Sequence, residues 1–356
     1  MRQSTAGAGH KFKSFLSRGG LFLLLIIGTF FIVFRHFDGK NLIKALNQTD
    51  PLYLLIGVFA MFLFISCEAF NLKRLLRIVG EKASASEAYL YAFTGFFYSA
   101  VTPSASGGQP MQLLYMKQKE ISISRGTLVL LLELCSFQII SILMGLSGLA
   151  FELEYMRKNL GNLRIVFIIG VGINIVVLII LLTVIFFPGV ANCGIKLADR
   201  IFKVIKIKNR AGKMRALEES IRGYREGAVC IYKNKTAMVK TLVITFIQMT
   251  AMHSVPYWVY LAFGGSGLGM GSFNLLQVIG LQAVLFVSVS ALPLPGAVGV
   301  SESAFVILFK TLFPASMMGS AMILSRGISF YAMVAFTGIF ILISHVHLKK
   351  INRPDL

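Results

Sequence analysis

Little in this sequence could hold a metal ion or a haem group. The 356 residues include only four cysteines, with no CxxC pair, and the five histidines form no ligand pattern with them. No GxxxxGK[ST] phosphate-binding loop occurs either, so we expect no energy from nucleotide hydrolysis in this chain. The sequence therefore predicts no metal and no other cofactor. The residues considered are Cys67, Cys135, Cys193, Cys230, His10, His36, His253, His345 and His347.

Charged residues are also scarce, and they make up only 14% of the chain. Hydrophobic residues make up 56%, and the mean hydropathy is +0.76, which lies outside the usual range of soluble domains. The alternating pattern of outer-membrane barrel strands is absent. The composition therefore predicts an all-α integral membrane protein.

Six apolar runs reach the roughly 20 residues that a helix needs to cross a hydrocarbon core of about 30 Å. The first run follows a basic stretch, as in a signal peptide, but no small-residue cleavage site comes after it, so we expect a retained helix. The predicted transmembrane helices are residues 20–37, 52–70, 127–150, 163–187, 236–263 and 318–344.

The formal net charge of +20 is unevenly distributed along the chain. Most Lys and Arg residues lie in segments 1–19, 71–86, 117–125, 188–235 and 347–356. Because cytoplasmic loops carry an excess of Lys and Arg, this distribution predicts that both termini are cytoplasmic. Nucleic acid is not an expected partner, since the charge is explained by topology.

The basic connector 188–235 allows two interpretations. Within 196–235, apolar residues recur at helical spacing between basic ones, as in a helix that lies on anionic lipid. An ordinary cytoplasmic connector that follows the charge rule would look the same. Neither interpretation makes it a catalytic domain, because about forty residues cannot build a substantial core.

Two further apolar stretches are interrupted by Pro and Gly. The stretch 88–116 contains TPSASGGQP, and the stretch 273–313 contains PLPGAVGVSES. The leading arm of the first is about 21 Å long as a helix, too short to cross, and basic residues flank both of its ends. We therefore expect a re-entrant hairpin that enters from the cytoplasm. The second could span through 273–292, but the basic C-terminal tail favours a re-entrant hairpin that enters from outside.

These features recur at a constant offset. Pro103 and Pro295 are 192 positions apart, and the same shift carries 52–70 into 236–263 and 127–150 into 318–344. The first copy starts outside and the second inside. The sequence thus predicts an inverted-topology repeat, residues 20–160 and 161–346, of the kind common in secondary transporters.

The hairpin tips are the predicted binding site. Irregular backbone at membrane depth is tolerated where it is buried in protein or lines a cavity, and a helix N-terminus there attracts an anion such as phosphate. The alternative is a packing turn whose side chains bond their own backbone. The candidate residues are Thr102, Ser104, Ser106, Gly107, Gly108 and Gln109 in the first tip, and Pro295, Gly296, Gly299 and Ser301 in the second.

Ionisable residues inside the membrane are costly and are usually functional. Glu133, Glu302 and Arg326 lie within the predicted spans and hairpins, and we expect them to line one polar cavity. Structural pairing of these residues is the alternative. Glu68 and Lys310 lie nearer the predicted interfaces, where snorkelling is the cheaper explanation.

Four segments carry a family resemblance: TPSASGGQP, LLELCSF around Glu133, PLPGAVGVSESAF, and Arg326 followed by Tyr331 and Gly338. Together they resemble the lysylphosphatidylglycerol synthase transmembrane (flippase-like) domain family, over nearly the whole chain. In full-length members, the resemblance implies, a soluble domain transfers lysine from lysyl-tRNA to phosphatidylglycerol. The membrane module then moves the product to the outer leaflet, which gives Gram-positive bacteria resistance to cationic antimicrobial peptides.

The resemblance implies a lipid flippase in a bacterial cytoplasmic membrane, with an anionic or aminoacylated phospholipid as its partner. The family-level enzyme name would be phosphatidylglycerol lysyltransferase, but no catalytic domain is expected here. Gln112 stands near a position where the family often carries a basic residue, so the lipid can differ. The membrane subunit of a synthase and a transporter of soluble solutes are the alternatives. A separate soluble synthase and a homo-oligomer stay open as partners.

Overall fold

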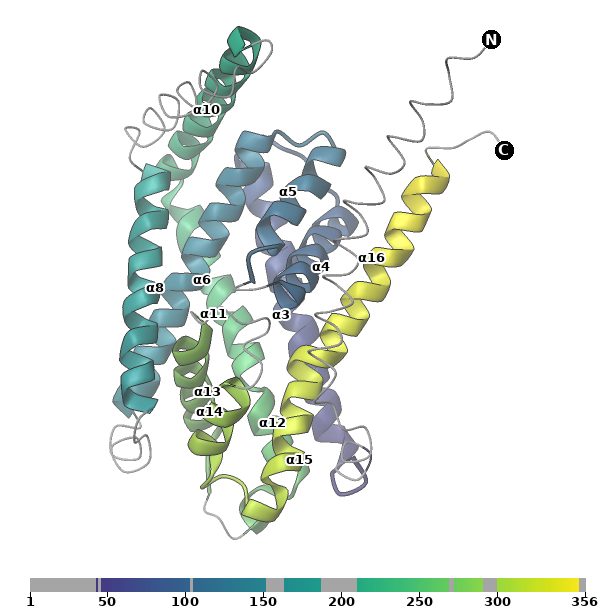
Figure 1. Cartoon of the computed structure of the whole chain (residues 1–356), viewed down its shortest axis with the longest axis vertical. Coiled ribbons are helices and arrows are strands. Elements are labelled where there is room, and N and C mark those ends of the chain that lie inside the picture. The colour runs from purple at the N-terminus through teal and green to yellow at the C-terminus, as the bar shows by residue number, and fades with distance from the viewer. Residues whose placement is uncertain are drawn as a thin grey trace, which may run out of the picture.

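The computed structural model describes residues 43, 46–102, 105–151, 163–186, 210–268, 272–290 and 300–351, and its regular structure there is helical (Figure 1). Within these described residues, five helical segments are long and apolar enough to cross a membrane. They coincide with the predicted spans other than 20–37, which lies outside the described residues. The prediction of an all-helical, multi-pass membrane protein is therefore confirmed. The segments are Pro51–Ile78, Ile123–Ala150, Arg164–Ile185, Lys235–Ala262 and Ala315–Ser344.

Helix α3 (Pro51–Ile78) runs the height of the bundle. Asp50 caps its start by accepting a hydrogen bond from the Leu52 N–H at 2.9 Å, and Pro51 occupies the first helical position, where a missing N–H costs nothing. Its 28 residues give a length of about 42 Å. Because α3 spans the bundle, its two ends define the two ends of the molecule.

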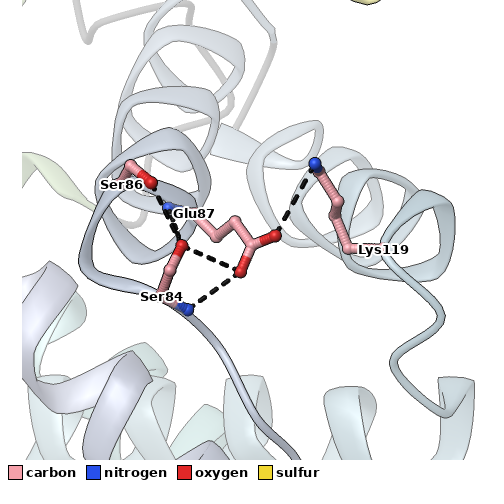
Figure 2. A network of polar contacts seen from close by, with 4 residues as sticks. All are labelled: Ser84, Ser86, Glu87 and Lys119. Atoms are coloured by element: carbon pink, nitrogen blue, oxygen red, sulfur yellow. Dashed lines mark hydrogen bonds and ion pairs between the residues drawn. The ribbon is translucent and has the colours of Figure 1, made fainter.

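Helices α4 (Ala85–Val101) and α5 (Gly108–Gln118) form a hairpin whose open ends lie side by side. Figure 2 shows the contact: Glu87 in the first turn of α4 pairs with Lys119 just beyond α5 at 3.6 Å. Ser84 and Glu87 also form a capping box at the start of α4. Glu81, just beyond α3, pairs with Arg125 of α6 (Ile123–Phe151) at 3.5 Å. The first hairpin therefore opens at the C-terminal end of α3.

The Glu87 contacts give a testable pH dependence. The backbone N–H of Ser84, the Ser84 hydroxyl and Lys119 hold the pKa of the Glu87 carboxyl below its ordinary value. A lowered folded-state pKa stabilises the protein above the unfolded-state value, and that stabilisation is lost as the pH falls through the folded-state value. We expect Glu87→Gln to cost roughly 1 kcal/mol at neutral pH. The deficit should vanish in acid, as measured by thermal unfolding in detergent. Glu226→Gln, in an exposed pair on α10, is the control and should change nothing.

Helices α13 (Leu275–Ser290) and α14 (Val300–Phe309) form the counterpart at the other end of α3. Phe273 before α13 and Phe313 after α14 both contact Tyr260 of α12 (Val255–Ala262), with ring centroids 6.5 and 6.2 Å apart. The carbonyl of Ala262 accepts a hydrogen bond from Asp50, at the start of α3. Accordingly, Figure 1 shows α5 in the upper half of the bundle and α14 in the lower half.

Two pairs of helix starts keep the 192-position offset. Helices α5 and α14 begin at Gly108 and Val300, and helices α6 and α15 (Ala315–Arg326) begin at Ile123 and Ala315. Each pair differs by 192 positions. The second arm of the later hairpin begins at Val300, so Ser301 and Glu302 belong to its first turn.

Two predicted spans are less regular than expected. Residues 236–263 form two helices, α11 (Lys235–His253) and α12, which meet at Ser254. Pro256 explains the break, because it has no N–H to continue the ladder. The last span contains a π-helical turn, η4 (Gly327–Tyr331), between α15 and α16 (Ala332–Ile351).

The basic segment contributes helix α10 (Arg210–Lys233), which packs against the bundle. A Cβ atom at Gly227 would lie 2.8 Å from the Cδ2 atom of Leu128, so the backbone of α10 approaches α6 closely. The Tyr224 hydroxyl donates to the carbonyl of Val184 on α8 (Leu163–Phe186) at 3.3 Å. The described part of the connector is thus a packed helix.

Small residues bring α13 close to α6. A Cβ atom at Gly148 on α6 would lie 2.9 Å from the Cα atom of Gly280 on α13, so the two backbones touch. Close approach through glycine is typical of helix packing in membranes. In contrast, α8 exposes aliphatic side chains along its length, as a lipid-facing helix does; they include Ile165, Ile168, Ile169, Ile173, Val176, Ile179 and Ile180.

Candidate functional site

The tip of the first hairpin is held by its own polar groups. The Thr102 hydroxyl donates to the carbonyl of Tyr98 at 2.5 Å and accepts from the Gly107 N–H at 2.8 Å. A Cβ atom at Gly107 would lie 2.6 Å from the Thr102 side chain, so this turn requires glycine. Thr102 therefore bonds its own backbone, as expected for a packing turn. Ser106 is exposed, and Gln109 is half-buried at the start of α5. Pro103 and Ser104 lie outside the described residues.

A second polar contact joins this hairpin to α3. The Gln112 side chain, 3% exposed, donates to Glu68 at 3.0 Å and to the carbonyl of Tyr91 at 3.1 Å. A Cβ atom at Gly95 would lie 2.6 Å from the Gln112 Cδ atom and 3.1 Å from Glu68, so glycine leaves room for the pair. The snorkelling explanation for Glu68 is therefore wrong, because its carboxylate contacts the hairpin interior. Lys310 is exposed, as snorkelling requires.

Glu133 on α6 lies near the same place. Its carboxylate interacts electrostatically with that of Glu68. Its Oε1 atom is buried and has no hydrogen-bond partner among the described residues. Helices α3 and α6 thus place two half-buried carboxylates in the same part of the bundle.

The second hairpin carries the other charged cluster. Arg326, the last residue of α15, donates from Nε to Glu302 Oε1 at 3.1 Å, and its Nη2 atom donates to the Ser301 hydroxyl. Both charged side chains are about four-fifths buried. The guanidinium also lies 5.4 Å from the ring centroid of Phe330 in η4. Ser301 and Glu302 are in the first turn of α14, where an acidic side chain interacts favourably with the positive end of the helix dipole.

The predicted site residues thus fall into separate groups. Ser301, Glu302 and Arg326 are brought together, whereas the described contacts of Glu133 lead to Glu68 and not to this pair. Pro295, Gly296 and Gly299 lie outside the described residues. A single cavity shared by Glu133, Glu302 and Arg326 stays a prediction.

Glu68, Gln112 and Gly95 were not among the predicted site residues. The sequence signal that could have identified Glu68 is a carboxylate within an apolar span, since ionisable residues inside a membrane are usually functional. Their contact depends on how closely α4, α5 and α3 approach, which no local pattern encodes.

Among the residues that the structure describes, no group of three or more His, Cys, Asp or Glu side chains could hold a metal ion. The arrangement offers instead a guanidinium with a carboxylate and a hydroxyl, in a bundle with lipid-facing helices. A guanidinium binds phosphate oxygens with two parallel hydrogen bonds.

The fold and these clusters define a multi-pass helical membrane protein with polar groups buried between its hairpins and spans. Residues 19–336 match the family described as the lysylphosphatidylglycerol synthase TM region, and the chain belongs to that family.

Similar proteins from three archaea support this assignment along the chain. A UPF0104 membrane protein of Archaeoglobus fulgidus is 20% identical over 93% of this chain and 98% of its own length. A UPF0104 membrane protein of Pyrococcus horikoshii is 23% identical over 90% and 96%. A third, from Methanothermobacter thermautotrophicus, is 24% identical over 81% and 82%.

Proposed function

We propose that this protein moves a phospholipid or a related lipid phosphate across the membrane. One observation carries the proposal: Arg326, Glu302 and Ser301 form a polar cluster at the start of α14, inside a bundle whose outer faces are apolar. The lipid phosphate would bind the guanidinium of Arg326 close to the positive, N-terminal end of α14. Glu302 would then be released to meet a cationic part of the headgroup.

The same proposal gives the two hairpins their role. We take α4–α5 and α13–α14 as re-entrant hairpins of an inverted repeat, with Ser106 and Gln109 facing the lipid path and with Gly107 and Gly108 packing the tip against α4. Their open ends at opposite ends of α3 and the 192-position offset support this view. Rocking of the two halves would expose the headgroup to either side in turn.

The proposed orientation follows from the basic end of the bundle. Arg77 at the end of α3, Lys119 after α5 and Arg125 at the start of α6 lie at one end, together with the open ends of α4–α5. The positive-inside rule places this end in the cytoplasm. The relatives named above are archaeal, so we propose a cell membrane without restricting it to bacteria.

Reconstitution tests the function. Purified protein in liposomes that carry fluorescent phospholipids should make lipid in the inner leaflet accessible to an external quencher, at a rate well above that of empty liposomes. Phosphate-free diacylglycerol of the same chain length is the matched control lipid, whose movement should not change. If no phospholipid class moves faster than in empty liposomes, the proposal fails. New aminoacyl lipid in extracts of expressing cells would favour a synthase subunit instead.

A further inference from the structure

We propose that Glu68 and Glu133 form a proton-binding site that holds one exchangeable proton and couples the pH gradient to lipid movement. The coupling rests on the proposed function, whereas the proton site itself does not. The site is distinct from the Glu302–Arg326 cluster, since it lies between α3, α5 and α6.

The chemistry starts from two carboxylates in one apolar environment. Like charges in a low dielectric cannot both be ionised at modest cost, so such a pair keeps one proton between them. The contacts of the two side chains agree with this. Glu68 accepts one hydrogen bond from the neutral amide of Gln112, and the buried Oε1 atom of Glu133 has no partner among the described residues. This oxygen atom of Glu133 can therefore carry the shared proton.

Among the described residues, no cation forms an ion pair with Glu68 or Glu133. Arg74, on the same helix as Glu68, is bonded to Thr241 and to the Ala237 carbonyl of α11. The exposed Lys117 and Lys240 lie outside the interior. In the described part of the chain, the Tyr91 hydroxyl and both ring nitrogens of His253 have no hydrogen-bond partner. The other buried titratable side chains on α3, α6 and the elements packed against them are Cys67, Tyr98, Tyr115, Cys135, Tyr260 and Tyr331.

The side chains around Glu68 are packed in a specific arrangement that depends on Gly95 and Gln112. Gly95 is the residue that admits the Gln112 amide, because a Cβ atom there would overlap the amide and touch Glu68. Gln112 holds Glu68 in place without neutralising it, whereas a basic side chain at this position would form an ion pair and remove the need for a proton. A proton is preferred over a metal cation, since a metal needs several more oxygen ligands than this site offers.

Infrared difference spectroscopy of the whole purified protein tests the site directly. At neutral pH we expect the C=O stretch of a protonated carboxyl group that disappears in the double variant Glu68→Gln/Glu133→Gln. In each single variant it should titrate at a different pH than in the parent protein, because repulsion is removed. Glu87→Gln, at the exposed start of α4, is the matched control and should keep the band. A parent protein without the band, a double variant that retains it, or a band displaced by sodium would overturn the proton site.

Liposomes with an imposed pH gradient test the coupling. The gradient should change the rate of phospholipid movement in the parent protein about fivefold or more. The double variant should still move lipid at a rate that ignores the gradient. A parent rate that is independent of the gradient would overturn the coupling. If no variant moves lipid at all, the proposed function fails, and the infrared result still decides whether the proton site exists.

Discussion

Replacing Arg326 by Gln should reduce phospholipid movement in liposomes at least about tenfold, to near the rate of empty liposomes. The side chain supplies charge-assisted donors to Glu302 and Ser301. Without it, Glu302 keeps a partly buried negative charge that repels a lipid phosphate. Breaking a fully buried ion pair typically lowers the free energy of unfolding by 3–5 kcal/mol. Because this pair is partly exposed, we expect Arg326→Gln to lower it by about 2 kcal/mol.

Three variants separate binding from simple structural support. Arg326→Lys should restore part of the stability but little transport, because an ammonium cannot make the same paired contacts. Lys310→Gln removes an exposed cation of the same region and should leave both properties unchanged. In the double variant Glu302→Arg/Arg326→Glu the two charges exchange places. If that swap recovers full transport, the pair is structural and its role in binding the headgroup is refuted.

We expect the second large effect, a loss of stability, from a substitution at the contact between Gly148 and Gly280. Gly148→Ala would place a methyl group against the backbone of α13, which has no flexible side chain to move away. Overpacking of this kind typically costs 1–3 kcal/mol, and we expect the upper half of that range because two whole helices must separate. Thermal unfolding in detergent measures the change.

Gly172→Ala on the lipid-facing helix α8 is the matched substitution. A Cβ atom there meets nothing within 4 Å, so the variant should be neutral or slightly stabilising through helix propensity. Equal losses in both variants would contradict the proposed tight α6–α13 contact.

Much of the architecture could be predicted because membrane spans depend on composition over long windows. Residues 52–70 and 127–150 are continuous apolar runs, and the structure has single helices there. The arms of the hairpins could be located because Pro and Gly interrupt the apolar pattern around residues 103–110. The break at Ser254 was missed, although Pro256 was visible, because one proline inside a span can bend a helix as well as end it.

The candidate site was predictable where charge alone marks it. Glu302 and Arg326 are ionisable residues in apolar segments, and a pairing between them was one of the two expected outcomes. Glu68 was assigned to the interface because its sequence position lies within two turns of Lys73 and Arg74. Its true environment depends on the hairpin that folds back beside it, and the missing side chain of Gly95 is what allows the contact with Gln112.

The π-helical turn after Arg326 changes the direction in which the side chains of the last span point. A turn that closes over five residues inserts one extra residue, and each residue of a helix rotates the following side chains by about 100°. Everything before η4 is therefore rotated relative to α16 by roughly this angle. Arg326 points at Glu302 on α14 while α16 keeps its own apolar stripe toward α4. A continuous α-helix of the same sequence could satisfy one of these two directions, and the extra residue lets a single helix satisfy both.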